Sequence, residues 1–198
     1  MKVIRIVAWA AVVAVAIFLL AQRFVNSQEA TDRLGGDFTL TAHTGDRMSN
    51  SDFRGKYMLI YFGYSFCPDV CPLELAKMTA GLNMLEEEGY NTAPLQPLFI
   101  TVDPERDTVE ALASYVQDFH PSLIALTGTM EEIQDVAKKY RVYFKKRQQD
   151  GIEGYLMDHQ SFIFVMGPDG DYVRLFSAKD QPSDIAAALK PVLEKARK

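Results

Sequence analysis

Short apolar runs alternate with segments of helical periodicity over most of the chain. Runs rich in β-branched, aromatic and aliphatic side chains predict strands at 38–40, 57–64, 98–102, 123–126, 162–166 and 172–176. Between and after them, helical spacing and capping signals predict helices at 73–88, 107–119, 129–140 and 183–196. This order mixes crossover units with a hairpin. We therefore expect an α/β fold whose central mixed sheet carries helices on both faces.

Particular side chains mark where these elements begin and turn. Asp107 and Glu110 have the spacing of a capping box, and so do Thr129 and Glu132. The sequence Gly-Pro-Asp-Gly at 167–170 predicts the turn between the last two strands. Segment 46–55, in contrast, is rich in turn residues and is expected to connect elements.

The N-terminal segment differs from the rest because residues 6–21 carry no charge. Including the two residues between Arg5 and Lys2, about twenty residues are available, which is enough to cross a bilayer. A membrane anchor, a cleaved signal peptide and a buried core helix all fit this pattern. The anchor is favoured because no clear small-x-small cleavage site follows Leu20. We expect an N-terminal transmembrane helix within 1–25, a linker at 26–37 and a folded domain at 38–198.

Composition and charge narrow the class of function. The chain has 198 residues, which suits one domain with an anchor, and a net charge of -5. That charge argues against a phosphate-binding surface, so we expect no nucleic-acid partner. Two cysteines are too few for a disulfide framework in a domain of this size.

The two cysteines lie four positions apart, after the apolar run at 57–64. Pro72 follows Cys71 and is expected to open a helix, whose N-terminal N–H groups stabilise thiolates. Thioredoxin-like redox enzymes have two residues between such thiols, whereas three separate Cys67 from Cys71. At this spacing the sulfurs could form a structural disulfide, a redox pair, an inert buried pair or part of a soft-metal site. Metal binding is favoured, and it needs a third ligand.

Three histidines are candidates for that ligand. His43 lies in a polar turn and is expected on the surface. His120 comes at a helix end, where it would cap the last carbonyl groups. His159 directly precedes a buried strand, and the residues alone leave it open whether it is a ligand or a hydrogen-bonded core histidine.

Three segments together resemble the Sco (SenC) family of copper chaperones. The first is FGYSFCPDVCP at 62–72, the second VDPERDT at 102–108, and the third Asp158-His159 followed by the turn at 167–170. The resemblance covers about 34–190. It implies a thioredoxin-like fold tethered to a membrane, with copper, Cu(I) or Cu(II), bound by Cys67, Cys71 and His159.

The resemblance also implies a task. A member of this family would deliver copper to the binuclear site in subunit II of cytochrome c oxidase, acting as a metallochaperone rather than an enzyme. The alternative is a thiol–disulfide oxidoreductase that reduces the cysteines of that site, with Cys67 and Cys71 as its catalytic residues. Another periplasmic copper chaperone or a thiol reductant would be a further partner. We expect a single-pass inner-membrane protein with its soluble domain on the periplasmic or extracytoplasmic side.

Neighbouring residues fit more than one role. The loop 103–107 is either a solvated loop with its own helix cap or a source of carboxylates near the copper and its partners. Asp158 either orients His159 or is an exposed cap, and Met157 is expected in the core rather than as an axial ligand. Phe66 supplies no additional nitrogen ligand beside Cys67.

Overall fold

The computed structural model describes residues 34–148 and 154–196, together with Trp9, Val15 and Phe18. The folded unit comprises Leu34–Lys198. Apart from Trp9, Val15 and Phe18, the predicted anchor in 1–25 lies outside the described residues, as does most of the predicted linker at 26–37. Among the residues that are described, no helix has the length and apolar character that a bilayer crossing requires.

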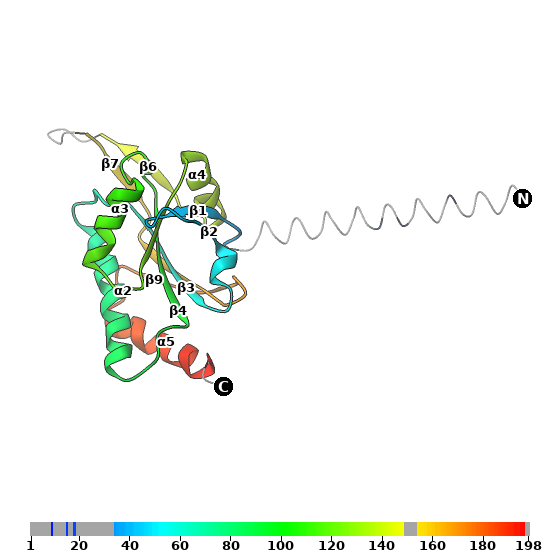
Figure 1. Cartoon of the computed structure of the whole chain (residues 1–198), viewed down its shortest axis with the longest axis vertical. Helices are drawn as coiled ribbons and strands as arrows, with labels where there is room; N and C mark the ends of the chain where they lie inside the picture. Colours follow the sequence, from blue (N-terminus) through cyan, green and yellow to red (C-terminus); the bar gives the residue numbers. More distant parts are fainter. Residues whose placement is uncertain (1–8, 10–14, 16–17, 19–33, 149–153, 197–198) are drawn as a thin grey trace, which may run out of the picture. The chain divides into compact units, whose positions relative to one another are not determined.

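Seven strands form one mixed sheet (Figure 1). Its spatial order is β2-β1-β5-β4-β3-β8-β9. The strands are β1 (Thr39–Ala42), β2 (Arg47–Ser49), β3 (Tyr57–Gly63), β4 (Leu95–Thr101), β5 (Ile124–Thr127), β8 (Phe162–Met166) and β9 (Tyr172–Ser177). The central strands β3, β4 and β5 are parallel, whereas the pairs at both edges are antiparallel. The mixed sheet predicted from the order of elements is confirmed.

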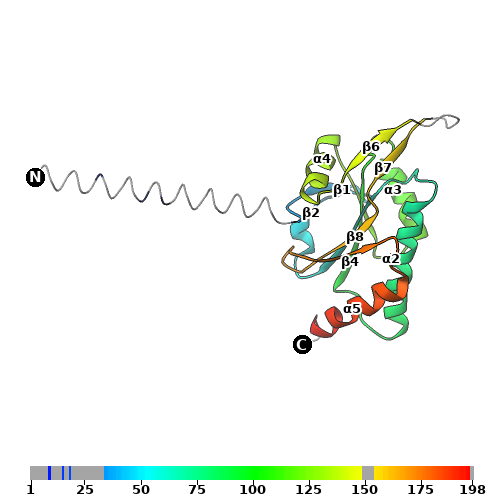
Figure 2. The same ribbon diagram turned by 180° about the vertical axis from the view of Figure 1, so that it is seen from behind.

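Helices connect the parallel strands and follow the last hairpin. They are α2 (Val70–Glu87), α3 (Val109–Tyr115), α4 (Met130–Lys139) and α5 (Pro182–Ala196), with short 3₁₀ turns at Asn50–Phe53 and Val116–Asp118. The capping box at the start of α4 is confirmed, because Thr129 accepts from the Glu132 N–H while Glu132 accepts from the Thr129 N–H. The C-terminal helix α5 packs along α2 (Figures 1 and 2).

Alternating side chains on the central strands bury both faces of the sheet. On one face the Tyr61 ring stacks on Phe99 at 6.4 Å, and Phe99 contacts Tyr115 of α3 at 5.5 Å. On the other face Phe62 lies 5.4 Å from Tyr140, which ends α4. Helices therefore cover both faces, as the sequence predicts.

Two strand pairings were not anticipated. Segment 46–55 contributes β2 at the sheet edge, although its turn residues predicted only a connection. A second, two-stranded sheet consists of β6 (Phe144–Arg147) and β7 (Leu156–His159). The sequence of β6, Phe-Lys-Lys-Arg, is mostly charged and lacks the apolar pattern of a buried strand. In both views this hairpin lies at the end of the domain opposite α5 (Figures 1 and 2).

Candidate metal centre

Strand β3 delivers the cysteine segment to the N-terminus of α2. The helix begins at Val70 rather than after Pro72, so Cys71 lies in its first turn and is buried. Cys67 lies in the loop before the helix and is half-buried. The Cys71 N–H donates to the Cys67 sulfur over 3.4 Å, which is the stabilisation that a free helix N-terminus offers a thiolate.

Gly63 at the end of β3 leaves room for the buried sulfur. A Cβ atom at this position would lie 2.8 Å from a carbon of the Tyr61 ring and 3.0 Å from both the Cys71 Sγ and a carbon of the Phe99 ring. All three contacts are tighter than ordinary van der Waals packing, and both rings are fixed in the core. Only glycine therefore fits between the strand end and the Cys71 sulfur.

A buried carboxylate holds the loop that leads to Cys67. Asp107 accepts hydrogen bonds from the Ser65 N–H at 3.0 Å, from the Ser65 hydroxyl and from the Thr101 hydroxyl. The predicted role of Asp107 as a helix cap is wrong, since Thr108 caps α3 by accepting from the Ala111 N–H. Asp103 and Asp107 are fully buried, so the reading of 103–107 as a solvated loop is also wrong for these two carboxylates.

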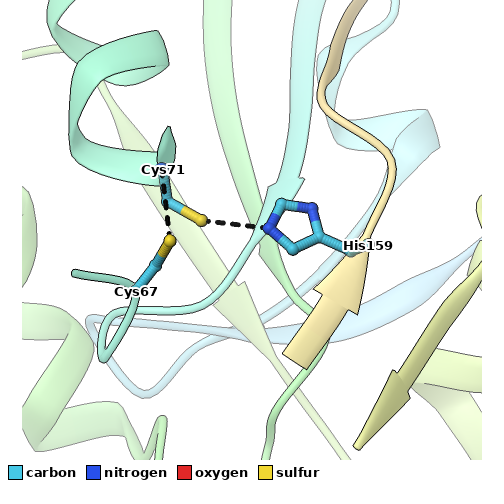
Figure 3. Close-up of side chains that lie close together, drawn as sticks. All are labelled: Cys67, Cys71 and His159. Carbon is cyan, nitrogen blue, oxygen red and sulfur yellow. Dashed lines mark hydrogen bonds between the residues drawn. The ribbon is translucent and has the colours of Figure 1, made fainter. Parts of the chain in front are cut away.

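Strand β7 brings His159 to the two sulfurs (Figure 3). Its Nε2 lies 3.2 Å from the Cys71 Sγ. Its Nδ1 lies 2.9 Å from the carbonyl oxygen of Gln160, which can only accept, so Nδ1 carries the proton and the Nε2 lone pair points toward the sulfurs. The rings of Tyr64 and Tyr61 meet the imidazole edge-on at 5.8 Å and 6.2 Å.

Of the two roles considered for Asp158, the structure excludes the one in which it orients the imidazole. Asp158 is exposed and pairs with Arg147 at 2.8 Å across the hairpin. Its place is taken by the backbone carbonyl of Gln160, a partner that no side-chain pattern could indicate. Met157 is buried in the core, as expected.

The donor atoms of Cys67, Cys71 and His159 all lie within 4.8 Å of one another. Zinc-like bond lengths around a trigonal ion would separate such atoms by roughly 4 Å. The cluster therefore fits one metal ion after small adjustments, in which the 3.2 Å separation of the Cys71 Sγ and the His159 Nε2 widens. The two other histidines lie elsewhere: His43 is half-buried and accepts from the Ala125 N–H, and His120 is buried against Ser122 and Glu86.

One proton is shared unequally between the two thiols. The hydrogen bond from Cys71 is the main cause that lowers the pKa of Cys67, and the backbone N–H groups of Asp69 and Cys71 add to it. The same bond, together with burial, raises the pKa of Cys71. The metal-free site therefore favours a thiolate on Cys67 and a thiol on the more deeply buried Cys71.

Comparisons with known proteins agree with this geometry. The family model described as SCO1/SenC matches residues 26–194. The human protein called "Protein SCO1 homolog, mitochondrial" is 46% identical over 166 residues, which are 83% of this chain and 54% of that protein. The chain thus spans about half the length of this relative.

Solved structures extend the likeness to the fold. Arabidopsis thaliana ScoI, solved with copper bound, is 38% identical with a TM-score of 0.73, and the match covers 83% of this chain and 98% of that chain. BsSco is described as having a disulfide switch and as a member of the Sco family of cytochrome c oxidase assembly proteins. It is 25% identical with a TM-score of 0.64, over 83% of this chain and 95% of its own.

These likenesses establish the thioredoxin-like α/β fold that the resemblance implied, with the mixed central sheet described above. They cover the domain that carries both the cysteine loop and the histidine hairpin. On this evidence, the chain belongs to the SCO1/SenC family.

Proposed function

We propose that this chain is a copper metallochaperone whose ion is held by Cys67, Cys71 and His159. The observation that carries the proposal is the convergence of two sulfurs and one aimed imidazole nitrogen within 4.8 Å. Thiolates are soft ligands that favour Cu(I), and imidazole suits copper in either oxidation state. Two thiolates and a neutral imidazole give a site charge of -1 with Cu(I) and zero with Cu(II), so a half-buried pocket can hold either ion.

The recipient in this proposal is the binuclear copper site in subunit II of cytochrome c oxidase. Family membership supports this assignment, as does the description of BsSco as belonging to a family of oxidase assembly proteins. The apolar segment at 6–21 would anchor the chain in the inner membrane, with the domain from residue 38 onward on the extracytoplasmic side. Another copper chaperone would supply the ion, or a thiol reductant would keep the two cysteines reduced.

A second function is favoured by the asymmetry of the thiols. A half-buried cysteine with a lowered pKa beside a more deeply buried partner is the arrangement of a thiol–disulfide oxidoreductase. The chain would then reduce the cysteines of the oxidase site before copper arrives. The described disulfide switch of BsSco lends support to this alternative.

Copper titration of the full chain in detergent, with Cys67→Ala, Cys71→Ala and His159→Ala as variants, separates the two functions. A metallochaperone loses tight copper binding in all three, while His159→Ala retains exchange with a small disulfide. If the chain serves only as an oxidoreductase, the wild type has no higher affinity for copper than His159→Ala has. Loss of exchange in His159→Ala together with copper binding would count against both assignments.

A further inference from the structure

The strand that carries His159 is not part of the main sheet. In the described part of the chain, β6 and β7 pair only with each other, with Phe144 opposite His159. An isolated two-stranded hairpin is marginally stable in water. The short link from His159 to β8 and the buried Met157 attach β7 to the main domain, and contacts from outside the hairpin must further fix the imidazole relative to the sulfurs.

Arg106 lies between the two halves of the site. Its guanidinium carbon is 3.8 Å from the centre of the Tyr155 ring, which belongs to the hairpin segment just before β7. The same carbon is 4.9 Å from the Phe66 ring, next to Cys67, and 5.7 Å from the Tyr64 ring. One planar cation is thus in contact with aromatic rings of both the cysteine loop and the histidine hairpin.

Hydrogen bonds fix the guanidinium in this position. Arg106 Nε donates to the carboxylate of the fully buried Asp103, and Nη1 donates to the Tyr155 carbonyl at 2.9 Å. The Tyr155 hydroxyl donates to the other oxygen of Asp103 at 2.8 Å. Nη2 is buried and has no hydrogen-bond partner among the described residues, so this part of the cation is held by its packing. Removing Arg106 would leave the Asp103 carboxylate bonded to the hairpin by one hydroxyl alone.

We infer that Arg106 is a positioning residue of the metal site, which holds the β6–β7 hairpin against the cysteine loop so that His159 reaches the sulfurs. Arg106 acts through His159 and does not bind the metal. The inference rests on the proposed function in one respect only, namely that His159 is a ligand. The position of the hairpin itself can be measured without copper.

The first experiment compares Arg106→Ala with Arg147→Ala in the full chain. Arg147 is a matched control because it carries the same charge and lies on the hairpin itself, while its ion pair in the described part of the chain is with the exposed Asp158. Cu(I) affinity, measured by competition with a coloured chelator, is expected to fall about 10–100-fold in Arg106→Ala, as for other residues that orient a ligand. It is expected to stay within about twofold of the wild type in Arg147→Ala. Equal losses in the two variants would overturn the inference.

A double-mutant cycle tests whether Arg106 acts through the imidazole. In the His159→Ala background, Arg106→Ala is expected to cause no further loss of Cu(I) affinity, because no ligand remains to be positioned. A loss as large as in the wild-type background would overturn the inference, since Arg106 would then act on the thiols. Arg106→Lys keeps the charge but not the planar stack, and we expect it to behave as Arg106→Ala does.

Amide hydrogen exchange of the copper-free chain provides the independent readout. Exchange in residues 156–159 is expected to be at least about tenfold faster in Arg106→Ala than in the wild type or in Arg147→Ala. If Arg106→Ala does not fold, Tyr155→Leu removes the stacked ring while leaving the Asp103–Arg106 pair, and the same acceleration is expected. Unchanged exchange would overturn the inference. Copper binding that does not depend on His159 would refute the proposed ligand set, and the exchange result would still decide the position of the hairpin.

Discussion

The two parts of the metal site, the cysteine loop and the histidine hairpin, are held in place by different kinds of contact. Cys67 and Cys71 lie between the central strand β3 and the N-terminus of α2, over a core that is buried on both faces. His159 lies on a two-stranded hairpin outside that sheet. Side chains from 103–106, the buried Met157 and the rings of Tyr61 and Tyr64 hold this hairpin against the rest of the domain. Backbone pairing thus fixes the sulfurs, whereas the third ligand depends on a few contacts. A site of this kind can keep its thiols in place while the imidazole moves.

The largest effect is expected on the cysteine side, from Asp107→Ala. This change leaves the Ser65 N–H, the Ser65 hydroxyl and the Thr101 hydroxyl without their acceptor. We expect a loss on the order of 3 kcal/mol in the free energy of unfolding, measured with urea. Asp46→Ala is the control, because the hydrogen bond that its carboxylate accepts within the described residues comes from Thr44 at the surface. A change as small as that of the control would show that the loop does not depend on Asp107.

Gly63→Ala tests how tightly the main sheet encloses the buried sulfur. The new methyl group would meet the Cys71 Sγ and the Phe99 ring at 3.0 Å, and overpacking of this kind costs about 1–3 kcal/mol. Thermal unfolding should therefore occur at a lower temperature, and Cu(I) affinity should fall because the sulfur is displaced. Gly36→Ala is the comparison, since its nearest neighbours are atoms of the long Lys139 side chain. Wild-type stability in Gly63→Ala would mean that the strand end yields easily.

The unequal thiols predict how alkylation depends on pH. Because the pKa of Cys67 is lowered chiefly by the hydrogen bond from Cys71, its thiolate persists as the pH falls toward the lowered pKa. The rate of alkylation by iodoacetamide should thus change little between about pH 5 and about pH 8. In Cys71→Ala the donor is gone, so the inflection should move to higher pH by at least about one unit. An inflection at the same pH in both proteins would contradict the shared proton.

The smallest effect is expected from Asp158→Ala on the hairpin. Asp158 pairs with Arg147 where both side chains are about half exposed, and such pairs contribute about 0–1 kcal/mol. Cu(I) affinity should remain within about twofold of the wild type, since the Gln160 carbonyl orients the imidazole. Measurement by chelator competition beside His159→Ala would show the contrast. A drop approaching that of His159→Ala would restore Asp158 as the orienting residue.

The same contrast explains what the sequence could and could not predict. The apolar run at 57–64 and the helical pattern after Pro72 placed Cys67 and Cys71 at a strand-to-helix junction, because core burial has a periodic signature. The strand Phe144–Arg147 has no such signature, since three of its four residues are charged and exposed. The hairpin that presents His159 was therefore missed, although His159 itself was identified from the family resemblance.

Two further misses concern hydrogen-bond partners rather than elements. Asp107 has the spacing of a capping residue, yet Thr108 occupies that position and Asp107 turns inward to Ser65 and Thr101. The acceptor for His159 is a backbone carbonyl, which every residue possesses. Residue types show which groups are available, but only the folded chain decides which of several adjacent groups forms the bond.

The unequal burial of the two cysteines sets a direction for any exchange at the site. Cys67 is the less buried of the two residues, whereas Cys71 is enclosed by the helix start and the strand end. A mixed disulfide would therefore form on Cys67, with Cys71 as the resolving thiol behind it. Under the proposed metallochaperone function, we expect the ion to leave Cys67 before it leaves the more deeply buried Cys71. The order in which the two sulfurs react thus follows from their unequal burial.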